Sequence, residues 1–178
     1  MSKTGVLLVN LGSPDSTSVS DVRKYLREFL MDGRVLDAPW PIRWCVVNLL
    51  ILPKRPKESA EAYEKVWTKD GSPLVVTSKK VHELLQDRTE LPIELAMRYQ
   101  NPSIESALEK LNTQGVTDLF MIPLFPHYAM SSFETAVERV KELITQNYSG
   151  MQVTSQAPYF EDADYVDALV ASIKPHLK

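Results

Sequence analysis

The stretch that decides the fold is residues 93–126, "IELAMRYQNPSIESALEKLNTQGVTDLFMIPLFP". It begins with a short apolar run at 93–99 and ends with another at 117–126, and such runs are typical of strands buried on both faces of a sheet. Between them, Asn101 is typical of a helix N-cap, Pro102 of the first helical position and Gly115 of a helix end. A strand, a helix and a second strand in this order predict two parallel strands joined by a right-handed crossover.

The same alternation extends in both directions from this stretch. The segment "GVLLVNLG" at 5–12 predicts a strand buried on both faces, and 151–160 predicts a further strand. Helices are expected at 21–30 with Ser20 as N-cap, at 57–67, at 74–88, at 131–148 with a Ser-x-x-Glu-like cap, and at 162–177. Strands that alternate with helices predict an α/β fold, with a parallel sheet flanked by helices.

Composition limits the classes of protein. The chain has 178 residues, 44% of them hydrophobic and 24% charged, which fits one globular domain over residues 1–178. The formal net charge of −3 argues against a nucleic-acid partner, which would normally face a basic surface. The single cysteine, Cys45, excludes an internal disulfide, and the short apolar run at 6–9 is not typical of a signal peptide. We therefore expect a cytoplasmic protein.

The least ordinary segment is 38–57, "APWPIRWCVVNLLILPKRPK". Its apolar part is far shorter than the roughly 20 residues of a membrane-spanning helix. It lies in an excursion between the first strand and Gly71, at the carboxyl edge where open parallel sheets bind ligands. We expect it to form an exposed apolar lip beside a ligand or on a membrane surface, with Lys54, Arg55 and Lys57 facing anionic groups. A buried core helix is the alternative.

Several polar residues near the expected carboxyl edge are candidates for ligand contact. Arg98 and Tyr99 end a strand and could hold the acid group and the flat face of a ligand, or could cap the strand at the surface. His127 follows a strand, but a hydrogen-bonded structural histidine is the favoured interpretation, because no other His, Cys or paired carboxylate lies close in sequence. His82 is expected to be exposed on its helix. Three scattered histidines, including His176, give no metal-ligand spacing.

Five motifs occur in order along the whole chain: "VLLVNLGSPDS", "VRKYLREFLMDGRV", "RPKESAEAYEKVWTKDGSPL", "MRYQNPSIESAL" and "IPLFPHYAMSSFET". Together they resemble the ferrochelatases, which insert ferrous iron into a porphyrin in the last step of haem synthesis. The resemblance implies two similar Rossmann-like, chelatase-like halves with a porphyrin cleft between them, and this chain would be the N-terminal half. The segment at about 34–57 would be the apolar lip of the cleft, and in membrane-associated members this lip also faces the bilayer.

The resemblance also implies roles for single residues. It places Leu11 and Ser13 over one porphyrin face, and Arg98 and Tyr99 as the "RY" pair that faces the macrocycle. Further positions contact porphyrin propionates or line the mouth of the pocket; they are Arg55, Tyr63 and Ser72, with Arg34 as an additional candidate. His127 matches a position at the back of the site, where it would act only through other groups.

The resemblance assigns no catalytic residue and no metal ligand to this chain. The family's metal-handling histidine, in a segment of the type "FSFHG", and its partner glutamate would lie beyond Lys178, as would the cysteines that bind an iron–sulfur cluster in some members. Neither His176 nor Cys45 takes these roles, so no cofactor bound by this chain is expected and ferrous iron would be a substrate of the complete enzyme. The expected partners are a porphyrin, the C-terminal half of the same enzyme, and the inner face of a membrane through Trp40–Leu52.

Three other readings stay open on the sequence alone. The chain could be a non-catalytic carrier or sensor of an apolar, acidic small molecule, an interaction module that uses the lip, or a nucleotide-binding enzyme, although no phosphate-binding fingerprint supports the last. For the 178 residues by themselves we expect weak porphyrin binding without metal insertion.

Overall fold

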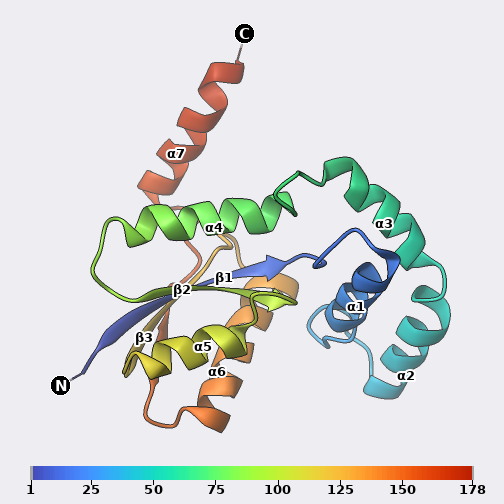
Figure 1. The fold of residues 1–178 in the computed structure, drawn as a ribbon, viewed down its shortest axis with the longest axis horizontal. Coiled ribbons are helices and arrows are strands. Elements are labelled where there is room, and N and C mark those ends of the chain that lie inside the picture. The colour runs from blue at the N-terminus through green and yellow to red at the C-terminus, as the bar shows by residue number, and fades with distance from the viewer. Residues whose placement is uncertain (1, 178) are drawn as a thin grey trace.

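A parallel sheet forms the centre of the protein, whose structure is a computed structural model that describes residues 2–177 (Figure 1). The strands are β1 (Thr4–Gly12), β2 (Ile93–Tyr99), β3 (Asp118–Pro123) and β4 (Gln152–Ser155), in the spatial order β2-β1-β3-β4. Every pairing is parallel, and β1 lies between β2 and β3. The predicted α/β fold with a parallel sheet is therefore confirmed.

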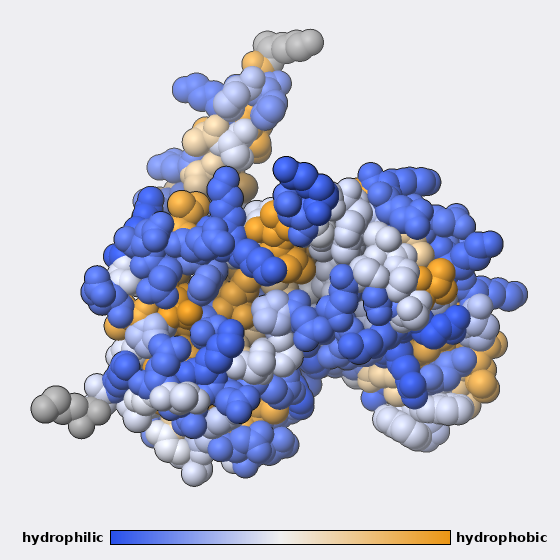
Figure 2. Space-filling model, viewed as in Figure 1, coloured by the Kyte–Doolittle hydropathy of each residue, from blue (hydrophilic) through white to orange (hydrophobic). Residues whose placement is uncertain are grey.

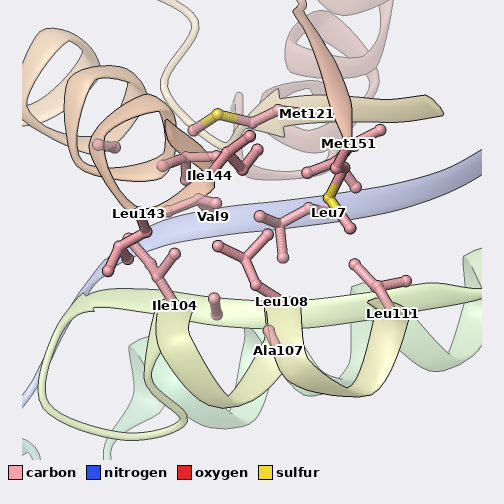
Figure 3. Packing of buried hydrophobic residues seen from close by; sticks show 14 of the residues in the cluster. Leu7, Val9, Ile104, Ala107, Leu108, Leu111, Met121, Leu143, Ile144 and Met151 are labelled. Atoms are coloured by element: carbon pink, nitrogen blue, oxygen red, sulfur yellow. The ribbon is translucent and has the colours of Figure 1, made fainter. Parts of the chain in front are cut away.

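Helices cover both faces of this sheet. Alternate residues of β1 point to opposite sides, and both sets are buried, as predicted for 5–12. On one side, Leu7 and Val9 pack with α5 (Ile104–Thr113) and α6 (Thr135–Asn147), as Figure 3 shows. On the other side, α4 (Pro73–Gln86) packs against Val6 and Leu8.

The excursion predicted after the first strand is a layer of helices beyond the carboxyl end of β1 (Figure 1). It comprises α1 (Val19–Leu30), α2 (Trp40–Cys45), the π-helical turn η1 (Val46–Ile51) and α3 (Arg55–Val66). No helix within residues 2–177 has the length and apolar character to cross a membrane.

The C-terminal part of the chain leaves the sheet. After the π-helical turn η2 (Met130–Glu134), α6 and β4, the helix α7 (Ala163–Ile173) projects away from the body of the protein and is followed by the short 3-10 helix η3 (Lys174–His176) (Figure 1). None of the residues of α7 is buried.

Three predicted helix starts are wrong in detail. Ser18, not Ser20, caps α1 by accepting a hydrogen bond from the backbone N–H of Asp21. Ser103, not Asn101, caps α5, because the Asn101 amide instead donates to the carboxylate of Asp15. The expected Ser-x-x-Glu cap before α6 does not form: Glu134 accepts hydrogen bonds from other side chains, and η2 precedes the helix.

Candidate functional site

The apolar segment after α1 has one buried and one exposed side. Val47 and Leu52 are buried against the body of the protein, whereas Trp40 is 60% and Leu50 is 68% exposed. Ile42, Trp44 and Leu49 are exposed as well. Figure 2 shows hydrophobic residues at the surface over α2. The alternative of a fully buried core helix is therefore wrong, and the segment is an apolar lip; below, the lip means residues 40–52.

Two of the predicted site residues meet at the start of α4. Ser13, which follows β1, and Ser72, the N-cap residue of α4, line the same pocket of about 400 Å³. Both are buried. The Ser13 hydroxyl has no hydrogen-bond partner within residues 2–177, and the Ser72 side chain makes no cap hydrogen bond. We call this the serine pocket.

The serine pocket can hold an anionic group. It lies at the N-terminus of a 14-residue helix, where backbone N–H groups without partners and the helix dipole favour negative charge. Lys79 adds a positive charge to the lining. Asp15 and Asp70 also line the pocket, so its charged side chains carry a net charge of −1. The hydrogen bonds that Asp15 accepts from the neutral Asn101 amide, at 3.0 and 2.9 Å, leave its charge in place, so hydrogen-bond donors rather than net charge would hold an anionic group here. A carboxylate oxygen could accept hydrogen bonds from both serine hydroxyls.

Arg55 and Tyr63 lie on α3, apart from the serine pocket. Arg55 is exposed and lines a second pocket, of about 420 Å³, whose walls include Phe29 and Leu50. Tyr63 is half-buried and packs edge-on against Tyr25, with ring centroids 6.4 Å apart. Burial raises the pKa of the Tyr63 hydroxyl, so this group stays a neutral hydrogen-bond donor at physiological pH.

Arg98 and Tyr99 do not form an open ligand surface together. Tyr99 is fully buried, whereas Arg98 lines a cavity of about 360 Å³, so the contact of the "RY" pair with a macrocycle stays a prediction. The Tyr99 hydroxyl donates to the carboxylate of Asp32 at 3.0 Å. The Arg98 side chain is 14% exposed and forms an ion pair with Asp32 at 2.6 Å. Arg98 Nε also donates to Thr135 Oγ1 at 2.8 Å. The alternative of capping at the surface is wrong for this pair.

Asp32 is the centre of this cluster, and sequence reasoning missed it. Besides Arg98 and Tyr99, the Thr135 hydroxyl and the backbone N–H of Arg34 donate to its carboxylate. Burial by itself would raise the pKa of Asp32, but the hydrogen bonds from Thr135 and Arg34 and the charge of Arg98 outweigh it and lower the pKa. The carboxylate is therefore ionised at neutral pH. No local pattern links position 32 to positions 98 and 135.

The remaining predicted residues lie at the borders of these features. Arg34 is half-buried, and its Nε donates to Glu134 at 3.2 Å, which connects the lip side of the protein to η2. Leu11 is half-buried at the end of β1.

His127 is exposed and stacks on Phe160 with ring centroids 5.2 Å apart. It makes no hydrogen bond to residues 2–177, so the interpretation as a hydrogen-bonded structural histidine is wrong. His82 is half-buried and hydrogen-bonded to the Ile93 carbonyl, so its expected exposure is wrong too.

The described side chains form no obvious metal centre. Among residues 2–177, no three His, Cys, Asp or Glu side chains lie close enough together to hold a metal ion. Cys45 is exposed and makes no disulfide. The site geometry thus consists of an apolar lip, a pocket lined by two buried serines, and the Asp32 cluster that joins the lip side to the sheet.

Comparisons with known proteins agree with one family. The family model described as Ferrochelatase matches residues 3–178. The chain is 51% identical to a ferrochelatase of Opitutus terrae over 99% of its own length and 52% of the relative's. It is 45% identical to the ferrochelatases of Stutzerimonas stutzeri and Pseudomonas fluorescens, over 100% of its own length and 52% of theirs. The chain thus spans about half the length of these curated relatives. From the family model and these identities together, the chain belongs to the ferrochelatase family.

Proposed function

We propose that this chain is the N-terminal, porphyrin-binding half of a ferrochelatase, the enzyme that inserts ferrous iron into protoporphyrin in the last step of haem synthesis. The observation that carries the proposal is the serine pocket, where the buried Ser13 hydroxyl without a partner and the free Ser72 side chain meet at the start of α4. Family membership supports the same function.

The chemistry of a porphyrin fits these features. A flat, largely apolar macrocycle needs aliphatic and aromatic walls, and its acid groups need hydroxyl or guanidinium donors. The lip and Leu11 are assigned to the walls. Ser13 and Ser72 are assigned to one carboxylate, and the exposed Arg55 on α3 is assigned to another together with Tyr63.

Other residues of the proposed site shape it or hold neighbouring groups in place. Arg98 would form the back wall, held in place by Asp32 and Thr135, and the buried Tyr99 would contribute through the same carboxylate rather than by touching the ring. Arg34, bonded to Glu134, would fix the entry of the lip.

The metal-insertion step itself needs groups beyond this half. Ring distortion uses binding energy from the walls, and removal of the pyrrole protons needs a positioned base. The family resemblance places that base, a histidine with a partner glutamate, in the other half of the enzyme. We therefore infer that this half binds and orients the porphyrin, and that the C-terminal half is its partner for turnover. Peripheral contact of the lip with the inner face of a membrane belongs to the same proposal, because exposed apolar side chains there need a cover.

An absorbance titration with protoporphyrin and coproporphyrin tests this function. The wild-type chain should shift the Soret band, and Ser72→Ala, Arg55→Ala and Tyr63→Ala should each weaken binding, Arg55→Ala by roughly tenfold or more because it removes a charge-assisted hydrogen bond. Lys141→Ala is the matched control, since Lys141 lies on α6 and pairs only with Glu138 among the described residues. Equal affinity for all four variants and the wild type would refute the assignment of the site.

A further inference from the structure

A further groove adjoins the serine pocket, since Lys24 in its lining lies 3.8 Å from Asp15 in the lining of the pocket. It has a volume of about 680 Å³ and runs between α1 and η1. Its lining combines cations with apolar and amide side chains: Arg23, Lys24, Arg27, Met31, Asn48 and Leu52. We call it the basic groove. The function proposed above uses none of the three cations.

The lining of the groove carries a net positive charge. Arg23 is held in place because its Nη1 donates to the Leu52 carbonyl, a partner without net charge. Arg27 forms no ion pair with any residue from 2 to 177. Lys24 lies 3.8 Å from Asp15 with 63% of its side chain exposed, so that pair is weak. The one carboxylate in the lining, Glu28, accepts hydrogen bonds from the neutral Gln100 amides and keeps its negative charge, so three cations against one carboxylate leave the lining with a net charge of +2.

The groove is continuous with the apolar lip. Asn48 lines the groove, and the next two residues of the same helical turn, Leu49 and Leu50, are exposed large hydrophobic residues. Cations also follow the lip at Lys54 and Lys57, both exposed. Residues 20–57 contain eight Lys and Arg against four Asp and Glu, although the whole chain has a net charge of −3. Positive charge is therefore concentrated around the exposed apolar side chains.

We propose that the basic groove binds the phosphate headgroup of an anionic phospholipid while Leu49, Leu50 and their neighbours in the lip enter the acyl region of the same leaflet. This inference rests on the peripheral membrane contact proposed above. It adds the class of lipid and the residues that bind its headgroup. A site for a free anion would need the cations alone. The apolar floor formed by Met31 and Leu52, and the adjacent lip, are the surfaces that a glycerol backbone and acyl chains would cover.

Vesicle co-sedimentation tests the role of the cations. The wild-type chain is compared on phosphatidylcholine vesicles and on phosphatidylcholine vesicles that contain phosphatidylglycerol. The double variant Lys24→Gln/Arg27→Gln should lose roughly thirtyfold in affinity for the anionic vesicles, as expected for two juxtamembrane charges. The charge-matched control Lys80→Gln/Lys141→Gln, with both lysines outside the groove lining, should change that affinity by less than about twofold. Equal losses in the two double variants would overturn the proposal, because the attraction would then be a property of net charge.

A titration without any membrane separates the groove from the lip. Dihexanoyl phosphatidylglycerol below its micelle concentration should perturb the amide resonances of Arg27 and Asn48, and dihexanoyl phosphatidylcholine and inorganic phosphate should bind much more weakly. Phosphate that binds as tightly as the anionic lipid would overturn the lipid assignment in favour of a free-anion site.

The double variant Leu49→Ser/Leu50→Ser tests the lip. It should reduce binding to neutral and anionic vesicles alike and leave the short-chain lipid titration unchanged. If wild type binds neither kind of vesicle, the proposed membrane contact fails, and failure of the short-chain titration separately overturns the groove.

Discussion

The guanidinium of Arg98 lies 2.6 Å from the carboxylate of Asp32, although 66 positions separate the two residues in the sequence. Arg98 belongs to the carboxyl end of β2, and Asp32 lies in the turn that follows α1. The Asp32 side chain is only 6% exposed. This ion pair connects the sheet to the layer of helices that carries the lip.

The first prediction concerns the loss of this carboxylate. Asp32→Ala should lower the free energy of unfolding by about 3–5 kcal/mol, because it leaves the Arg98 guanidinium buried without its charged partner. Urea unfolding measures the difference. The control is Glu138→Ala, which breaks an exposed pair with Lys141 on α6 and should cost less than about 1 kcal/mol. Similar losses in the two variants would show that the Asp32 pair is no stronger than a surface pair.

The second prediction concerns pH. The folded-state pKa of Asp32 is lowered, so its contribution to stability is fully present above the pKa of the unfolded chain, about 3.9, and is lost as the pH falls through the folded value. The wild type should therefore lose more stability than Asp32→Asn when the pH is reduced from 6 to below about 3.9. Urea unfolding of both proteins across this range gives the two slopes. A constant difference between them at all pH values would mean that Asp32 does not titrate differently in the folded and unfolded states.

Local sequence patterns predicted the fold well because the strands and helix faces are determined mainly by burial. The run at 93–99 is β2 with the same bounds, and Gly115 follows α5 in a left-handed conformation. The helix starts were less predictable, because a local cap competes with distant partners. Asn101 was available to cap α5, but Asp15, 86 positions away, binds its amide instead.

The candidate site was predictable where one segment suffices and not where distant segments combine. The lip is visible as a single apolar stretch with cations at its end, and its exposure follows from its place outside the sheet. The Asp32 cluster brings together the ends of α1, β2 and η2, and the burial of Tyr99 is a consequence of that packing. A single sequence contains no signal for such a cluster, although a charged residue directly after an amphipathic helix is a position worth inspecting.

The third prediction follows from the corrected start of α5. Ser103→Ala should lower stability by about 1 kcal/mol, because the Ser103 side chain accepts a hydrogen bond from the backbone N–H of Ser106 at 3.2 Å. Asn101→Ala removes only an exposed contact to Asp15 and should cost less. The two variants are compared by urea unfolding and by hydrogen exchange at the first turn of α5, where only Ser103→Ala should speed exchange. Faster exchange in Asn101→Ala would restore Asn101 as the cap.

The last prediction concerns the glycine that leads from β1 into the serine pocket. Gly12 has a φ of +104° and faces Tyr99 across the sheet, and a Cβ at this position would lie 2.0 Å from the Tyr99 carbonyl oxygen. Gly115 also has a positive φ, +79°, but a Cβ there would meet nothing within 4 Å. Gly115→Ala therefore measures the conformational cost alone, about 1–2 kcal/mol, whereas Gly12→Ala adds a backbone clash and should cost at least about 3 kcal/mol.

The same clash should affect porphyrin binding. Because it can be relieved only by moving β1 away from β2, Gly12→Ala should also displace Ser13 and weaken porphyrin binding, and Gly115→Ala should leave that binding unchanged. Urea unfolding and the porphyrin titration measure the two effects, and equal stability losses in the two variants would show that the approach of Gly12 to Tyr99 does not constrain this residue.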